Sequence, residues 1–212
     1  STPVAPSPAS AAAKNETNNS DRDGLAKRAG TSGATGSIVG FNGSRRTPPP
    51  VNEPIRSYAP GTPERAELKA RLASMASEHV DIPIIVDGEE IRTGETANVI
   101  MPHAHQHVLG TWHGATVEHV AQAIDAAERA RADWGNWPFE ERAGVFLRAA
   151  ELLSTRHRAT INAATMLGQS KTAFQSEVDA ACELADFWRF NVHFAENLLA
   201  DQPVNDKGVW NQ

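Results

Sequence analysis

A run of apolar residues near the C-terminal end recurs at alternating steps of four and three residues. An α-helix has about 3.6 residues per turn, so this spacing keeps the run on one helix face. The run consists of Phe174, Val178, Ala181, Ala185, Trp188, Val192, Ala195 and Leu199. A stripe of this length has to be buried against other elements, and we therefore expect a helix-lined core. The helix is expected to begin around Lys171-Thr172.

A second apolar face lies on the opposite side of this helix and carries a carboxylate. Phe187, Phe190 and Phe194 group there, and Glu183 stands one turn before Phe187. A helix that is apolar on two sides is expected to be buried on both, and burying an unpaired charge is costly. Glu183 is then either a site residue set into a pocket or an ion-paired acid, with Arg189 or a partner chain as its counterion. Helix geometry leaves both interpretations open.

A change in composition near Val51 predicts where the folded part begins. Ala, Ser, Thr, Gly, Pro and Asn occupy 36 of the first 50 positions. Such a segment cannot bury enough apolar surface to offset its ordering entropy. We predict a disordered leader over 1–51, stiffened at its end by the proline triplet 48–50, and a folded part over 52–212.

Two apparent motifs in this leader are explained by its composition. The glycines lack the spacing of a phosphate-binding loop, and a flexible linker is the better interpretation. They are Gly30, Gly33, Gly36 and Gly40. The glycosylation-like triplets at Asn15, Asn18 and Asn42 are attributed to chance in a Ser/Thr-rich stretch.

Past the boundary, the pattern predicts short antiparallel strands followed by helices, an α+β arrangement. Asp87-Gly88 between two short apolar runs indicates a hairpin. Pro63 and Pro138 stand where a helix begins. The expected strands are 84–86, 91, 98–101 and 107–112, with another at 209–210; the expected helices are 62–77, 116–135, a run from Pro138 through Leu153, 159–167 stopped by Gly168, and the long C-terminal helix.

Charge and hydropathy exclude several classes of protein. The net charge of −6 argues against a nucleic-acid binder, which needs a basic surface. No apolar run approaches the roughly 18 residues of a membrane span. The single cysteine, Cys182, excludes an intrachain disulfide and suits a reducing compartment. With no basic partner at helical spacing to activate it, Cys182 is expected to be a packed thiol.

Three histidines at alternating positions are the remaining candidate site. His103, His105 and His107 would share one face of an extended chain, as metal ligands do. Pro102 interrupts the segment, however, and no cysteine or acidic ligand is placed beside it. We therefore expect solvated loop histidines and no bound metal.

Several segments in this order resemble the N-terminal portion of the Δ1-pyrroline-5-carboxylate dehydrogenases, a branch of the aldehyde dehydrogenase superfamily. The strings Met-Leu-Gly-Gln-Ser-Lys-Thr at 166–172 and Asp-Phe-Trp-Arg-Phe-Asn at 186–191 are its most specific signs. The others are 52–65, 84–91, 102–105, Trp134, 142–143, 147–150 and 183–185. The resemblance covers about 52–212, so the chain is similar to one part of an α/β aldehyde dehydrogenase fold.

The resemblance implies an NAD-dependent oxidation of L-glutamate γ-semialdehyde to L-glutamate in proline catabolism. The family glutamate that receives the α-amino end of the substrate matches Glu183. The family's nucleophilic cysteine, general base and NAD site match nothing in this chain, and Cys182 is not that nucleophile. The resemblance thus implies no catalytic or cofactor-binding residue here, and the chain alone is expected to be inactive without bound NAD.

The resemblance also implies a homo-oligomer that acts on a small molecule. From the charge and hydropathy we expect no nucleic-acid or membrane partner. We expect a cytoplasmic protein, or one of the mitochondrial matrix if the source is eukaryotic. Two alternatives stay open: a non-catalytic interaction or oligomerisation protein derived from the same fold, and a histidine-rich metal-binding module.

Overall fold

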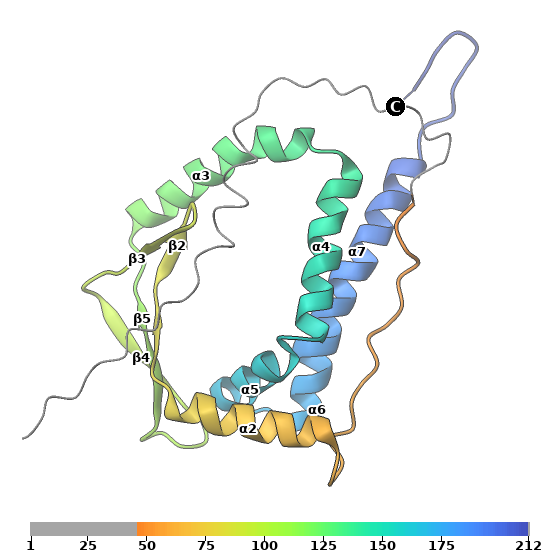
Figure 1. Ribbon diagram of the computed structural model, residues 1–212. Coiled ribbons are helices and arrows are strands. Elements are labelled where there is room, and N and C mark those ends of the chain that lie inside the picture. Colours follow the sequence, from red (N-terminus) through yellow and green to blue (C-terminus); the bar gives the residue numbers. More distant parts are fainter. Residues whose placement is uncertain (1–45, 212) are drawn as a thin grey trace, which may run out of the picture. The chain divides into compact units, whose positions relative to one another are not determined.

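The computed structural model describes residues 46–211. The leader predicted over 1–51 lies mostly outside the described residues, together with its glycines and asparagine triplets. The described residues form one unit by their contacts. The elements of this unit, shown in Figure 1, are α2 (Pro63–Ser77), β1 (Val80–Ile82), β2 (Ile84–Val86), β3 (Glu89–Ile91), β4 (Thr96–Ile100), β5 (Val108–His113), α3 (Val117–Asn136), α4 (Phe139–Ser154), α5 (Arg158–Gln169), α6 (Ala173–Ser176), the π-helical turn η2 (Glu177–Cys182) and α7 (Glu183–Ala200).

The strands form one three-stranded sheet and one hairpin. The hairpin β2–β3 confirms the prediction from Asp87-Gly88, since both residues have positive φ angles, 55° and 79°. Strands β4 and β5 pair antiparallel, as expected. Strand β1 was not predicted, and it pairs with β5 in parallel. Gly110 permits this close pairing, because a Cβ there would overlap the carbonyl oxygen of Val80.

The first helices begin as the sequence predicts. Pro63 opens α2, and Pro138 precedes α4. Thr116 accepts a hydrogen bond from the amide of His119, whose ring accepts one from the amide of Thr116, so these two residues cap α3 reciprocally. None of the described helices is both long enough and apolar enough to cross a membrane.

The ends of α5 and of the chain differ from expectation. Helix α5 runs through Gly168 to Gln169, and it ends because Ser170 takes the left-handed conformation, with φ of 57°. The C-terminal tail forms a single bridge between Asp206 and Val209 where a strand was predicted at Val209-Trp210.

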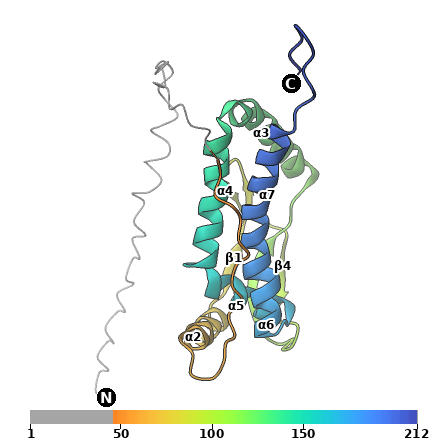
Figure 2. The same ribbon diagram turned by 90° about the vertical axis from the view of Figure 1, so that its right-hand side faces the viewer.

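The long C-terminal helix is interrupted by the π-helical turn η2, between α6 and α7. Helix α7 packs along α4, and α2 packs against α5 (Figures 1 and 2). The expected stripe is buried at Ala181, Ala185 and Val192. Its two ends, Phe174 and Leu199, are exposed. Only the middle of the stripe is therefore part of the core.

Candidate functional site

Glu183 is the first residue of α7, and its backbone N–H donates to the carbonyl oxygen of Val178. This i to i+5 bond is the last one of the π-helical turn. The side chain of Glu183 is exposed. Phe187 and Phe194 on the same helix are 57% and 53% exposed. Phe190, the third aromatic residue of this face, is half-buried, so the second aromatic face is largely exposed among the described residues.

A pocket of about 330 Å³ lies beside the start of α7. Its walls come from α5, the loop after it, η2 and α7. They are formed by Ile161, Thr165, Gln169, Lys171, Asp179, Ala180, Leu184 and Phe187. Lys171 and Asp179 form an ion pair of 2.7 Å within this lining. Leu184 and Phe187 bring the pocket to the face of α7 where Glu183 stands, although Glu183 itself is not part of the lining.

The buried acid of this region is Glu177, at the start of the π-helical turn, and not Glu183. Glu177 has no exposed surface. Its carboxylate accepts hydrogen bonds from the hydroxyl of Tyr58 at 2.7 Å and from Asn162 Nδ2 at 2.8 Å. The amide of Arg56 donates to it at 2.8 Å, and Arg158 pairs with it through Nε and Nη2. Tyr58, Asn162, Arg56 and Arg158 thus all donate to the Glu177 carboxylate.

This geometry decides the charge states of the cluster. Burial alone would raise the pKa of Glu177, but the hydrogen bonds from Arg158, Tyr58, Arg56 and Asn162 lower it from 4.5 to about 2. Burial and the hydrogen bond to Glu177 raise the pKa of Tyr58 from 10.0 to about 12. Burial acts to lower the pKa of Arg158, but its hydrogen bonds to Glu177 and Glu53 outweigh burial, and the net effect raises this pKa above its ordinary value. Glu177 is therefore a carboxylate and Tyr58 a neutral donor at neutral pH.

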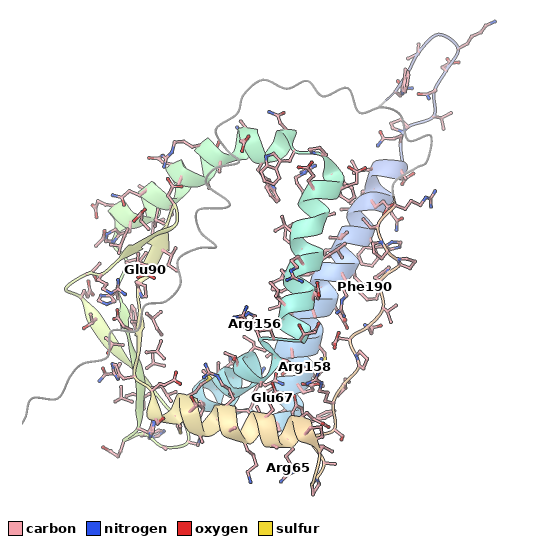
Figure 3. The ribbon with its side chains drawn as sticks, viewed as in Figure 1. Arg65, Glu67, Glu90, Arg156, Arg158 and Phe190 are labelled. Carbon is pink, nitrogen blue, oxygen red and sulfur yellow. The ribbon has the colours of Figure 1, made fainter. Side chains whose placement is uncertain are left out.

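An extended segment, residues 46–58, runs beside α7 and joins this cluster (Figure 2). The amide of Thr47 donates to Glu196 at 2.9 Å, and the amide of Glu53 donates to Asp186 at 2.7 Å. The carboxylate of Glu53 pairs with Arg158 on one oxygen and with Arg189 on the other. Figure 3 shows Arg158 at the start of α5, close to the beginning of α7, and Phe190 further along α7.

The counterion of Arg189 is therefore Glu53, together with Asp186, and not Glu183. Sequence reasoning considered Arg189 as a partner for Glu183. It missed Glu177, Arg158 and Asn162 altogether. Their one sequence signal is that Arg158 and Asn162 stand four residues apart on the apolar face of a short helix, where polar side chains need a partner.

Cys182 lies in the same cluster as a protonated thiol. Its side chain is buried, and the Arg158 Nη2 atom lies 3.4 Å from its sulfur. Burial and the nearby Glu177 carboxylate raise the pKa of Cys182 from 9.0 to about 11. A thiol with this pKa is a poor nucleophile at neutral pH. The geometry agrees with the expected packed thiol.

Two of the three histidines in the 103–107 row contact different partners. His103 Nδ1 lies 2.8 Å from Ser170 Oγ, and His107 Nε2 lies 2.8 Å from the carbonyl oxygen of Ala76. Among the residues that the structure describes, no group of three His, Cys, Asp or Glu side chains could hold a metal ion.

A second pocket, of about 320 Å³, lies between α4, the end of α3 and α7. Four of its nine lining residues are aromatic, and Arg142 adds a guanidinium whose buried Nε has no partner among the described residues. The lining consists of Trp134, Phe139, Arg142, Ala143, Phe146, Trp188, Asn191, Val192 and Ala195. The pocket lies on the packed face of α7, away from the exposed side chain of Glu183.

The sequence pattern of the aldehyde dehydrogenase family matches residues 90–211. Among curated relatives, delta-1-pyrroline-5-carboxylate dehydrogenase of Agaricus bisporus is 47% identical over 169 residues, covering 79% of this chain and 31% of that protein. The mitochondrial enzyme of that name from Dictyostelium discoideum is 43% identical, covering 77% of this chain and 30% of the relative.

Solved structures give the same picture. The Delta-pyrroline-5-carboxylate dehydrogenase from Mycobacterium tuberculosis, bound with NAD, has a TM-score of 0.77 and 48% identity, covering 80% of this chain and 32% of the other. A mutant of 1-pyrroline-5-carboxylate dehydrogenase from Thermus thermophilus has a TM-score of 0.70 and 27% identity, covering 77% and 32%. The chain thus spans about a third of the length of the proteins that it matches.

Proposed function

The chain belongs to the aldehyde dehydrogenase family, and from this premise we propose that it is the N-terminal part of an NAD-dependent enzyme that oxidises L-glutamate γ-semialdehyde to L-glutamate. The semialdehyde forms from Δ1-pyrroline-5-carboxylate by hydrolysis, which makes this a step of proline catabolism. The similarity to enzymes named for that substrate, at 40–47% identity in several fungi, animals and a slime mould, supports the proposal.

The residue that we assign to the substrate is Glu183. The observation that supports it is its place as an exposed carboxylate at the head of α7, one turn before Phe187 and beside a pocket. A carboxylate on an aromatic face pairs well with an ammonium group once water is excluded, because the interaction strengthens as the dielectric falls. Glu183 would then hold the α-amino end of the substrate while the aldehyde end reaches the reacting groups.

The reacting groups themselves have no counterpart among the described residues. Cys182 is buried with a pKa raised to about 11, so it does not supply the thiolate that attacks an aldehyde. We propose that the chain positions substrate, and that by itself it carries out no oxidation.

The described residues also do not fit a nicotinamide dinucleotide. A dinucleotide site needs a glycine-rich turn between a strand and a helix, with amides free for phosphate. The turn from β5 to α3 has only Gly114, and the side chain of Glu95 lies against it, where a Cβ would be 3.3 Å from Glu95 Cγ. A carboxylate there would repel a pyrophosphate. We propose that NAD is held by the remaining two thirds of the enzyme length.

We further propose a homo-oligomer in an aqueous compartment, without nucleic acid or membrane as partner. The exposed apolar side chains of the C-terminal tail, Val204, Val209 and Trp210, support an association surface. Curated relatives from Dictyostelium discoideum and Mus musculus are named as mitochondrial. The compartment would be the mitochondrial matrix in a eukaryote and the cytoplasm in a bacterium.

A hybrid enzyme tests the proposed function directly. Residues 46–211 would replace the matched segment of the Mycobacterium tuberculosis enzyme, and NADH formation from L-glutamate γ-semialdehyde would be measured. The hybrid should be active, and the 212-residue chain alone should form no NADH. An inactive but folded hybrid, or NADH formed by the chain alone, would contradict the proposal.

A second substrate tests the role of Glu183 in the same hybrid. Glutarate semialdehyde has the same carbon chain without the α-amino group. Glu183→Gln should lower kcat/KM for L-glutamate γ-semialdehyde by roughly 10- to 100-fold relative to glutarate semialdehyde, the size expected for one charge-assisted contact. Equal losses of kcat/KM on both substrates would show that Glu183 does not bind the α-amino group of the substrate.

A further inference from the structure

The π-helical turn η2 decides where Glu183 stands. An α-helix continued from Glu177 would bond the amide of residue 183 to the carbonyl of residue 179, whereas here it bonds to Val178. The wider turn rotates everything after it relative to α6, including the direction in which Glu183 leaves the helix. Such turns are rare, and they persist only where surrounding contacts hold them.

The contacts that hold the start of this turn converge on Glu177. Arg158 and Asn162, one turn apart on α5, and Tyr58 on the extended segment all donate to its carboxylate. Glu177 is fully buried and Arg158 is 2% exposed. A regular α-helical turn would change how Glu177 and the start of α7 are placed relative to each other, and any loss of these bonds would leave buried charges unpaired, at considerable cost.

The same extended segment also forms hydrogen bonds with α7, the helix after the turn. The amide of Glu53 and the side-chain amide of Asn52 donate to Asp186, at 2.7 and 2.8 Å. Asp186 stands three residues beyond Glu183, and Glu177 stands six residues before it. The segment therefore bonds to the helix on both sides of Glu183, through Arg56 and Tyr58 at one end and through Asn52 and Glu53 at the other.

We propose that Glu177 is a positioning residue: clamped by Arg158, Asn162 and Tyr58, it holds the π-helical turn whose last bond sets Glu183 toward the ammonium group of the substrate. We call Glu177 with Arg158, Asn162 and Tyr58 the clamp. The clamp acts through Glu183 and touches neither substrate nor cofactor. This inference rests on the proposed function, because it takes Glu183 as the ammonium-binding residue.

The test measures selectivity in the hybrid enzyme described above, as the ratio of kcat/KM for L-glutamate γ-semialdehyde to that for glutarate semialdehyde. A purely structural defect lowers both values and leaves the ratio unchanged. Glu177→Gln should lower the ratio roughly tenfold, since small misplacements of a binding group can cost up to a hundredfold. Tyr58→Phe removes one donor and should lower it less, by roughly threefold; this milder variant decides the question if Glu177→Gln does not fold.

The matched control is Asp81→Asn, which also converts an ion-paired carboxylate into an amide. Asp81 pairs with Arg92 and His113 at the sheet, outside the clamp. Its ratio should not change. The double variant Glu177→Gln with Glu183→Gln should have the same ratio as Glu183→Gln alone, because the clamp has no other route to the substrate.

The outcomes separate the two proposals. If Glu183→Gln lowers the ratio but Glu177→Gln and Tyr58→Phe do not, the clamp is overturned and the ammonium site stands. If Glu183→Gln leaves the ratio unchanged, the ammonium site falls and the positioning role falls with it. A further drop in the double variant would show that Glu177 acts elsewhere, and would also overturn the inference.

Discussion

Arg158 and Glu177 form an ion pair that is almost entirely shielded from water. Two nitrogens of the guanidinium donate to the carboxylate, and the exposed fractions of the two residues are 2% and 0%. Tyr58, Asn162 and the amide of Arg56 also donate to the carboxylate. The pair also connects α5 and the extended segment to the π-helical turn. Its loss would therefore weaken the packing of all three segments.

Removing one partner of this pair should destabilise the chain strongly. Arg158→Ala leaves Glu177 without a counterion and Glu53 with Arg189 alone, and we expect a loss of about 3–5 kcal/mol in the free energy of unfolding. Urea denaturation followed by tryptophan fluorescence would measure it. The control is Arg131→Ala, which breaks the exposed pair with Glu128 and should cost less than about 1 kcal/mol. Similar losses in both variants would contradict a buried pair.

Stability should fall at acid pH because of Glu177. Its pKa is lowered from 4.5 to about 2 in the folded chain, so the unfolded state binds a proton first as the pH falls. The stabilisation is complete above about pH 5, and it is lost progressively between pH 4.5 and 2. The loss attributable to this group is about 3 kcal/mol.

Urea midpoints measured from pH 6 to pH 2 would test this. The Glu177→Gln variant should be less stable at pH 6 and should have a flatter profile below pH 5, because it lacks the titrating group. The control is Glu128→Gln, which removes an exposed carboxylate outside the cluster. Parallel profiles for the wild-type chain and Glu177→Gln would show that Glu177 does not titrate in this window.

The Cys182 thiol should resist alkylation while the chain is folded. Burial and the nearby Glu177 raise its pKa to about 11, so very little thiolate is present at pH 8. Iodoacetamide labelling followed by mass spectrometry should be slow in native buffer and complete in minutes in concentrated urea. Equally fast labelling in both conditions would show that the thiol is accessible.

Local turn and cap chemistry explains which elements could be predicted from the sequence. Asp87-Gly88 requires only two adjacent positive φ angles, and Pro63 and Pro138 act within one helical turn, so each signal is complete in a few residues. The parallel pairing of β1 with β5 joins residues about thirty positions apart. Strand β1 is three residues long and mostly exposed, and it leaves no periodic signal.

The candidate site shows more clearly what helical periodicity cannot predict from the sequence. The prediction of Glu183 used a constant rotation per residue along 172–200, and the π-helical turn breaks this constancy at Glu177. Helical periodicity singled out Glu183, which is exposed, and gave no reason to select Glu177, which is buried. Only the contacts with Tyr58 and Arg158, made over long sequence separations, decide where the wider turn forms.

Two glycines should respond in opposite directions to the same substitution. Gly110→Ala places a Cβ against the carbonyl oxygen of Val80, and either β1 or β5 has to move. We expect a loss of at least about 1–3 kcal/mol, as for overpacked sites. Gly168→Ala meets no atom within 4 Å, and it lies inside α5 where the sequence predicted the helix to end.

Because alanine is the better helix former, Gly168→Ala should stabilise the chain by roughly 0.5–1 kcal/mol. Thermal unfolding of the two variants, measured side by side, checks both statements. If Gly168→Ala destabilised the chain instead, α5 would end before Gly168, and Ser170 would not be its left-handed cap. If Gly110→Ala had no effect, β1 would not approach β5 as a paired strand.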